Sequence, residues 1–508
     1  MYKFKSSLLV VAGLIAAAMP LSVRANIKAA NTYYQQEQYP QALKQYLLAA
    51  RVGNVHAQCM LGTMYYQGQG TSVDKLEAVS WFILASENGH QDARNIARSL
   101  LAELSEEERA ALNDAVSIQL SNFGPEAVRE TFYPKVILAN VAKRVSFGKP
   151  IELGTLELEM PVNIDSGINE DLIDLLADET DDDTAGLDLS LSADINALQE
   201  YLRDDSNYFL IGDFLLAEDG SLRSFSPLFQ YGRWRSVIER VQKLHGQPAY
   251  FGDEPVVFPG RLMLGQAQMP LGLLSLRERF PRLYRGIRNN KSRAEKGSAH
   301  DKYIYALTLE YFQGLRRGDT EIVDLLTDAA EQGHDEAQFV LGMKLYREQM
   351  DPIAGVQWIA EAAKQGQVHA EYWLGQFFLI SPWHEYDEKL AAFWFARAAK
   401  QGFVAAIRDL ARLYLFSTDK SLSDDKKALD HISRIAESDA DNPETLRILA
   451  WATKRNGQRN TAIKTLEKAI RLGDERGWNT NLWLDELNEW KGRGVVHSEE
   501  LSPAHKFQ

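Results

Sequence analysis

The sequence predicts an α+β protein dominated by an α-solenoid, with helix-pair repeats in two blocks and a small α+β domain between them. Three observations predict this class. Small and apolar residues recur at a fixed period in both halves of the chain, and short strand-like stretches interrupt them in the middle. The composition of the 508 residues, 45% hydrophobic and 25% charged, is that of an ordinary globular chain with several domains.

The repeats are clearest in the C-terminal half. Gly333, Gly366 and Gly402 are separated by 33 and 36 residues, and each is followed by alanine at the fourth position and leucine at the eighth. Tryptophan stands eight residues before the last two of these glycines, at Trp358 and Trp394. The N-terminal part shows matching offsets around Gly53 and Gly89. A period of this length is typical of stacked helix pairs.

The residue types explain how such units would stack. Alanine and glycine let two helices approach closely, and aromatic residues fill the groove between successive units. The recurring glycines end helices, because glycine readily adopts the left-handed conformation. We therefore expect Trp394 to be buried between adjacent units.

These residues also carry a family resemblance. The stretch 57–70, followed by Asp74, Ala78 and Trp81, resembles the Sel1-like repeat, a branch of the tetratricopeptide-like helical repeats. The segments beginning at Trp358 and Trp394 resemble it too, and Leu446 to Ala469 resemble a standard tetratricopeptide repeat. The resemblance covers about residues 28–120 and 300–476 and implies curved stacks of helices that bind partner proteins. An insertion at 380–388 departs from the pattern.

The first 25 residues are predicted to be a signal peptide. Lys3 and Lys5 precede an apolar run from Leu8 to Met19, and Val23-Arg24-Ala25 provides a cleavage site. The run is short for a membrane span. We expect a mature chain that begins at Asn26 in the periplasm; the alternative is an uncleaved anchor.

The N-terminal repeats, residues 26–125, are expected to end in a capping helix. Ser105 and Glu108 have the spacing of a capping box at the start of that helix. Gly124-Pro125 is predicted to close the domain.

Residues 126–206 are predicted to be a strand-containing segment with an acidic linker at about 165–192. The window 150–202 holds 15 acidic residues and no lysine or arginine. A calcium loop is the alternative, because Asp181, Asp183 and Gly186 have partial EF-hand spacing. Ala185 and Ser192, however, stand where ligands are needed.

Residues 207–276 are predicted to form a small α+β domain. Strands at 208–216 and 222–225 flank a Glu-Asp-Gly turn, and a helix at 234–244 precedes a strand at 256–264. This order resembles the C-terminal domain of the energy transducer TonB. The resemblance implies a protein-binding module and brings no catalytic residues.

A basic linker is predicted at 277–299, followed by the C-terminal repeats at 300–480 and a tail at 481–508. Arg282, Arg285 and Arg288 recur every three residues, as on one face of a helix. They are candidates for contact with an anionic partner such as lipid phosphates, lipopolysaccharide or an acidic protein. The alternatives are a contact with the acidic linker of the same chain and a solvated face.

The sequence predicts no catalytic residue, cofactor or metal site. It lacks the GxSxG, Walker A, HExxH and CxxC motifs, and the single cysteine, Cys59, is expected to be a small buried hydrophobe. His384 and Glu385 are expected in a solvated loop. Glu77, Glu361 and Glu371 are expected to be ordinary residues on helix faces.

The predicted function is a non-enzymatic periplasmic scaffold or adaptor that binds proteins at the cell envelope through its helical repeats. The formal net charge of −14 argues against nucleic-acid binding. Two alternatives remain open: a TonB-like energy-transduction or transport-accessory protein, and an envelope enzyme with an unrecognised site.

Overall fold

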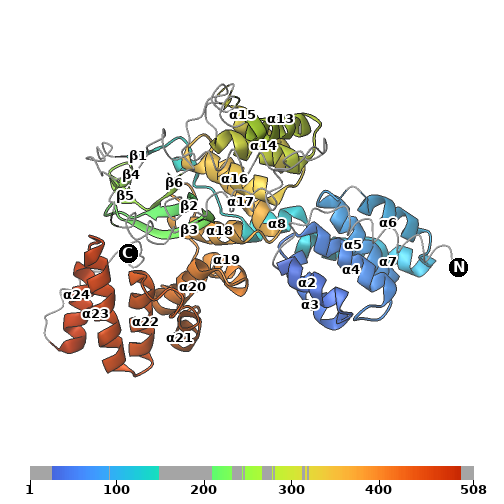
Figure 1. Cartoon of the computed structure of the whole chain (residues 1–508). Helices are drawn as coiled ribbons and strands as arrows, with labels where there is room; N and C mark the ends of the chain where they lie inside the picture. Colours follow the sequence, from blue (N-terminus) through green and yellow to red (C-terminus); the bar gives the residue numbers. More distant parts are fainter. Residues whose placement is uncertain are drawn as a thin grey trace, which may run out of the picture. The chain divides into compact units, whose positions relative to one another are not determined.

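The computed structural model describes residues 26–90, 92–147, 209–231, 243, 246–265, 277, 281–311, 315–316, 318 and 320–492. The chain divides into two compact units, each built from segments that are distant in sequence. Figure 1 shows the helices and strands of the chain, coloured by their position in the sequence. The first unit comprises the residues up to 138 together with 353–379 and 383–406, and the second comprises 139–352, 380–382 and the residues from 407 onward. The predicted fold class is confirmed, since helix pairs dominate and strands lie between them in sequence.

The N-terminal part of the first unit is entirely helical. Its cores gather around Tyr46, Trp81 and Phe82, which are at most 2% exposed. The predicted capping box of Ser105 and Glu108 is present. The helices are α2 (Asn26–Gln35), α3 (Tyr39–Ala50), α4 (Val55–Gln67), α5 (Lys75–Glu87), α6 (Ala93–Leu101), α7 (Glu106–Phe123) and α8 (Pro125–Phe132).

Helix α8 was not predicted. Proline is well suited to the first turn of a helix, because its missing N–H would have no partner there. Pro125 therefore starts α8 where the sequence indicated the end of the domain. A short 3₁₀ turn, η1 (Leu138–Asn140), follows.

Three helices from the C-terminal half complete the first unit: α17 (Pro352–Lys364), α18 (Val368–Ile380) and α19 (Glu388–Lys400). Gly366 and Gly402, which follow α17 and α19, have φ of 85° and 82°, the left-handed conformation expected of them. Trp394 has no exposed surface, so the prediction that it is buried is confirmed.

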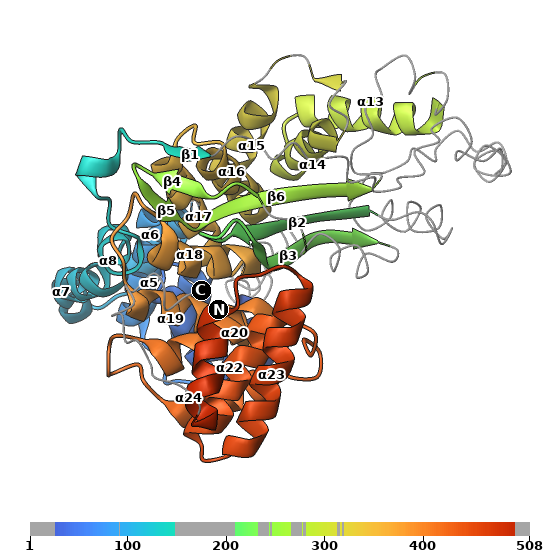
Figure 2. The same ribbon diagram turned by 90° about the vertical axis from the view of Figure 1, so that its left-hand side faces the viewer.

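The second unit holds two three-stranded antiparallel sheets, one in the order β3-β2-β6 and the other β1-β4-β5. Figure 2 shows β2, β3 and β6 side by side. The predicted hairpin is present, with Gly220 at its turn in the left-handed conformation. The strands are β1 (Val145–Phe147), β2 (Phe209–Leu216), β3 (Leu222–Tyr231), β4 (Ala249–Phe251), β5 (Glu254–Val256) and β6 (Phe258–Gly265). The predicted final strand is thus divided at residue 257.

Helices make up the rest of the second unit. They are α13 (Pro281–Glu295), α14 (Ala299–Tyr311), α15 (Glu321–Glu331), α16 (Asp335–Arg347), α20 (Val404–Phe416), α21 (Asp425–Ser433), α22 (Pro443–Arg455), α23 (Arg459–Glu475) and α24 (Asn481–Lys491). Among the described residues, no helix combines the length and the apolar character needed to cross a membrane.

Two predictions about the second unit are wrong: the linker at 277–299 and the tail at 481–508. Most of the predicted basic linker is helix α13, which packs against α14. The predicted C-terminal tail begins with α24, because Trp483, Leu487 and Trp490 form one apolar stripe that is buried against α22 and α23.

Four predictions concern residues outside the described ranges: the signal peptide, the acidic linker at 165–192, the calcium alternative at Asp181, Asp183 and Gly186, and nearly all of the helix at 234–244.

Candidate protein-interaction surfaces

A buried ion pair joins α18 to α19 in the first unit. The carboxylate of Glu371, which is fully buried, accepts hydrogen bonds from Nε of Arg397 at 2.8 Å and from Nε2 of Gln401 at 2.6 Å. The guanidinium of Arg397 also lies 5.3 Å from the ring centroid of Trp394. The interpretation of Glu371 as an ordinary face residue is wrong: it is an internal carboxylate that holds two repeat helices together.

Glu77 and Glu361 also have internal partners. Glu77 accepts hydrogen bonds from Trp81 Nε1 at 2.9 Å and from Gln119 Nε2 at 2.5 Å, which ties α5 to the capping helix α7. Partial burial raises the pKa of Glu77. Glu361 accepts a hydrogen bond from the Tyr133 hydroxyl. Both carboxylates therefore link elements of the first unit.

The N-terminal helices and the C-terminal repeats meet inside the first unit. Asn54 Nδ2 donates a hydrogen bond to the carbonyl of Lys364 at 3.0 Å. Trp394 Nε1 lies 3.4 Å from the carbonyl oxygen of Phe132, the last residue of α8. Burial and the neighbouring Glu361 raise the pKa of Tyr133. This surface of α17 and α19 is thus covered by the end of the N-terminal block.

The insertion at 380–388 is part of the same contact. Trp383 has no exposed surface and His384 is only 4% exposed, so the expectation of a solvated loop is wrong for His384, whereas Glu385 is exposed as expected. Val136 forms an antiparallel bridge with His384. Burial lowers the pKa of His384 to about 4, so its imidazole is neutral at pH 7. Trp383 and His384 are buried because another segment of the chain pairs with the insertion, whereas Tyr386 is exposed.

The β3-β2-β6 sheet is bound to helices of the second unit through buried charges. The carboxylate of Asp213 is fully buried and lies 2.8 Å from Nε of Arg261 and 3.8 Å from a guanidinium nitrogen of Arg347 on α16. On the edge strand β3, Ser224 accepts a hydrogen bond from Arg408 of α20 at 3.0 Å and donates one to Glu444 of α22 at 3.3 Å. Burial opposes the ionisation of Glu444, but the nearby arginines outweigh it and lower its pKa.

These contacts bear on the predicted TonB-like module. The guanidinium carbon of Arg223 in the hairpin lies 5.0 Å from the ring centroid of Trp478. Asp219 at the hairpin turn accepts a hydrogen bond from the backbone N–H of Asn479. Arg223 and Asp219 of the hairpin are thus engaged by the connection between α23 and α24 of the same chain. The resemblance to TonB finds no support.

The basic candidate residues lie on α13. Arg285 and Arg288 are exposed, and neither pairs with an acidic group in the part of the chain that the structure describes. Arg282 lies on the same helix, with its side chain outside the description. The three-residue spacing therefore does fall on a helix.

One group of potential metal ligands occurs among the described residues: His334, Asp335 and Glu336. Nδ1 of His334 accepts the Ala337 N–H at 3.2 Å as an N-cap, and its Nε2 lies 3.3 Å from Nδ1 of His300. Burial and His300 lower the pKa of His334 to about 4. Both ring nitrogens of His334 have partners, and this residue acts as the N-cap of α16.

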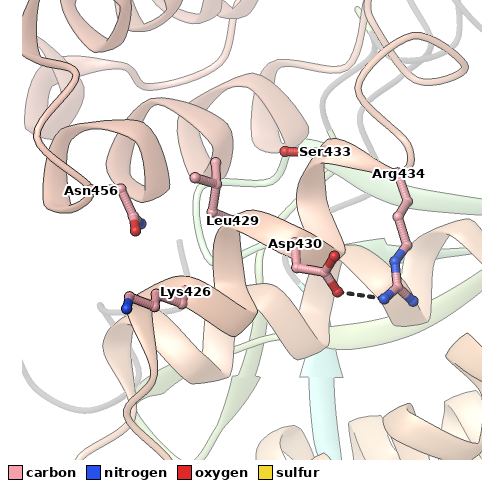
Figure 3. Close-up of a pocket in the computed structure, with 6 residues that line it drawn as sticks. All are labelled: Lys426, Leu429, Asp430, Ser433, Arg434 and Asn456. Atoms are coloured by element: carbon pink, nitrogen blue, oxygen red, sulfur yellow. Dashed lines mark hydrogen bonds and ion pairs between the residues drawn. The ribbon is translucent and has the colours of Figure 1, made fainter.

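An open depression of about 630 Å³ lies on α21 (Figure 3). Within it, Asp430 and Arg434 pair with each other one helical turn apart. The lining residues are Lys426, Leu429, Asp430, Ser433, Arg434 and Asn456. Because Asp430 and Arg434 are matched, Lys426 is the remaining charged residue of the lining, and the depression offers no concentrated charge to a ligand.

Sequence reasoning missed the contact between α8 and the C-terminal repeats. Its residues, Tyr133, Glu361 and the segment 135–137, form no recognisable motif. The unusual length of the loop at 380–388 was the single signal, since an insertion in a regular repeat requires a partner or solvent to cover it.

The helix pairs define a helical-repeat protein of the α-solenoid class. The Sel1 repeat family model matches residues 55–90, 335–367, 368–403 and 404–439, so the chain carries Sel1 repeats in both of its helical blocks. Proteins with Sel1 repeats generally mediate protein–protein interactions. No curated protein is similar enough to be matched.

Two solved structures are similar to the chain. One is a Sel1 repeat protein from Oxalobacter formigenes, with 24% identity over 40% of this chain and 60% of that one and a TM-score of 0.32. The other is c5321, a protective antigen present in uropathogenic Escherichia coli strains displaying an SLR fold, with 16% identity over 92% and 78% of the two chains and a TM-score of 0.33. The match spans less than two thirds of the Oxalobacter protein.

Proposed function

We propose that the protein is a non-enzymatic scaffold or adaptor of the periplasm that binds partner proteins at the bacterial cell envelope through its Sel1 repeats. The observation that carries the proposal is the presence of Sel1 repeats in both helical blocks. Stacked helix pairs present extended surfaces suited to proteins and peptides. Glu77, Glu361 and Glu371 on these helices accept hydrogen bonds from within the chain. Burial raises the pKa of the Cys59 thiol, which disfavours the thiolate that a nucleophile requires.

Site-specific photo-crosslinking tests the binding function. A photoreactive residue at Tyr386 or Val404, which are exposed on the repeats, is expected to capture a discrete protein from the envelope fraction. The same group at Ile118, exposed on the capping helix α7, serves as the control position. Equal, diffuse labelling at all three positions would argue against a specific repeat surface.

The location makes a separate prediction. Cleavage after Ala25 gives a mature protein with Asn26 at its N-terminus, recovered from the periplasmic fraction. N-terminal sequencing of the purified protein checks this. Recovery of Met1 in the membrane pellet would show an uncleaved anchor instead.

The α13 arginines are proposed as an auxiliary contact for an acidic protein partner. Replacing Arg282, Arg285 and Arg288 by glutamine is expected to weaken the crosslinked complex several-fold and to reduce its salt dependence, because exposed charges mainly steer association. The free energy of unfolding should change by less than about 1 kcal/mol, since the exposed charges of Arg285 and Arg288 contribute little. Pull-down at two salt concentrations measures the first effect.

The matched control removes three exposed cations elsewhere in the second unit: Lys420, Lys426 and Lys464. This variant has the same net charge as the arginine variant. Equal weakening by both would show a general charge effect. Unchanged binding with faster hydrogen exchange in residues 165–192 would indicate that α13 contacts the acidic segment of its own chain.

A further inference from the structure

Residues 125–137 lie on the first unit as a one-sided peptide. Val128, Phe132 and Tyr133 are buried, at positions i, i+4 and i+5. The residues between and beside them are exposed: Pro125, Glu126, Arg129, Glu130, Thr131 and Lys135. Burial of one stripe is the pattern of a helix packed on the surface of a domain, and an amphipathic helix bound in a groove shares it.

The end of this helix is held by aromatic contacts. The ring of Phe132 lies 5.0 Å from that of Phe393 and 6.4 Å from that of Trp394, both on α19. Next to it, the Tyr133 hydroxyl donates to Glu361 of α17, and Glu361 is also bound by Lys364 at 2.9 Å. The aromatic pair therefore combines apolar burial with one directional hydrogen bond.

The following residues pair with the inserted loop through an antiparallel bridge. Ile137 N–H donates to the Trp383 carbonyl at 2.9 Å, and Glu385 N–H donates to the Lys135 carbonyl at 2.8 Å. Between them, Val136 bridges His384. Main-chain pairing of this kind supplies affinity that does not depend on side-chain identity.

The contact is also discrete along the chain. Gly124 ends α7 before the segment, and Leu138, 84% exposed, follows it; α8 also contacts α7, and Val128 packs beside Gly53. One contiguous stretch of 13 residues thus makes both the helical and the strand contacts.

From these contacts we infer that α17, α19 and the loop 383–385 form a peptide-binding site, occupied here by the chain's own residues 125–137. The site accepts from a partner protein a segment of the same design: a short amphipathic helix that ends in two aromatic residues and continues as a strand. This inference rests on the proposed scaffold function and specifies its recognition chemistry. A partner segment would bind by displacing the internal one.

A labelled peptide of residues 124–140 tests the inference. It is added to the full mature chain carrying Phe132→Ala and Tyr133→Ala, which weakens the internal segment, and binding is followed by fluorescence anisotropy. We expect saturable binding at least tenfold tighter than to the unmodified chain, where the tethered segment competes at an effective concentration of about 1 mM. A peptide with both aromatic residues replaced by alanine should not bind. A folded variant that fails to bind the native peptide would overturn the inference.

A second measurement tests the inference if the variant with Phe132→Ala and Tyr133→Ala does not fold. A protease site inserted after Leu138 in the otherwise unmodified chain allows the folded protein to be cut once. Excess native peptide is then expected to increase hydrogen exchange at residues 125–137, and the alanine peptide is not. Unchanged exchange at saturating peptide would show that the segment is a fixed part of the core.

The two proposals fail in different ways. Peptide binding without any specific crosslinked envelope protein would support the site but not the scaffold function. Crosslinking at Tyr386 or Val404 without peptide binding would support the scaffold function and overturn the peptide-binding site.

Discussion

Trp394→Ala is expected to lower the free energy of unfolding by about 3–5 kcal/mol, as truncation of large buried aromatic side chains does. Trp394 has no exposed surface and contacts Phe132, Phe393 and Arg397. The substitution opens a cavity at the contact between α8 and α19. The loss should therefore reach the N-terminal helices, because neighbouring elements share the stability of a stacked structure.

Urea denaturation with hydrogen exchange as a second probe measures this effect. Trp358→Ala is the matched control, because Trp358 stands at the same offset in the preceding repeat but is only partly buried. Trp358→Ala should lower the free energy of unfolding clearly less than Trp394→Ala does. A loss below about 1 kcal/mol for Trp394→Ala would contradict the burial on which the repeat assignment depends.

The repeats were predictable because their signal is periodic. Glycine, alanine, leucine and tryptophan at fixed offsets describe contacts between helices that are close in sequence, and the left-handed glycines and the buried Trp394 follow from them. The hairpin at Gly220 was predictable for a similar reason, since its turn chemistry is local.

Contacts between distant segments were not predictable in the same way. The bonds from Tyr133 to Glu361 and from Lys135 to Glu385 join residues more than 200 positions apart, and no local pattern encodes them. A glutamate on a helix is usually solvated, so Glu371 resembled any other face residue until its partner Arg397 was known. Charge similarly led to the interpretation of 277–299 as a linker, although the helical spacing of Arg282, Arg285 and Arg288 does fall on α13.

The second large effect is expected at the buried pair of α18 and α19. Glu371→Leu should lower the free energy of unfolding by about 3–5 kcal/mol, because it leaves the guanidinium of Arg397 buried without its counter-charge. Arg397→Met should also lower the free energy of unfolding, because it leaves the buried carboxylate of Glu371 without its counter-charge. The exposed pair of Asp430 and Arg434 on α21 is the matched control, and Asp430→Ala should change the stability by less than about 1 kcal/mol.

The double variant Glu371→Leu/Arg397→Met separates charge from packing. Replacing both partners by apolar side chains of similar size removes the desolvation penalty of each ion, so the double variant should recover most of the stability that either single variant loses. A double-mutant cycle in urea would then give a coupling energy of at least about 2 kcal/mol, beyond the range of independent sites. Additive losses would mean that Glu371 stabilises the helices chiefly through Gln401, its other hydrogen-bond donor, and that the ion pair contributes little.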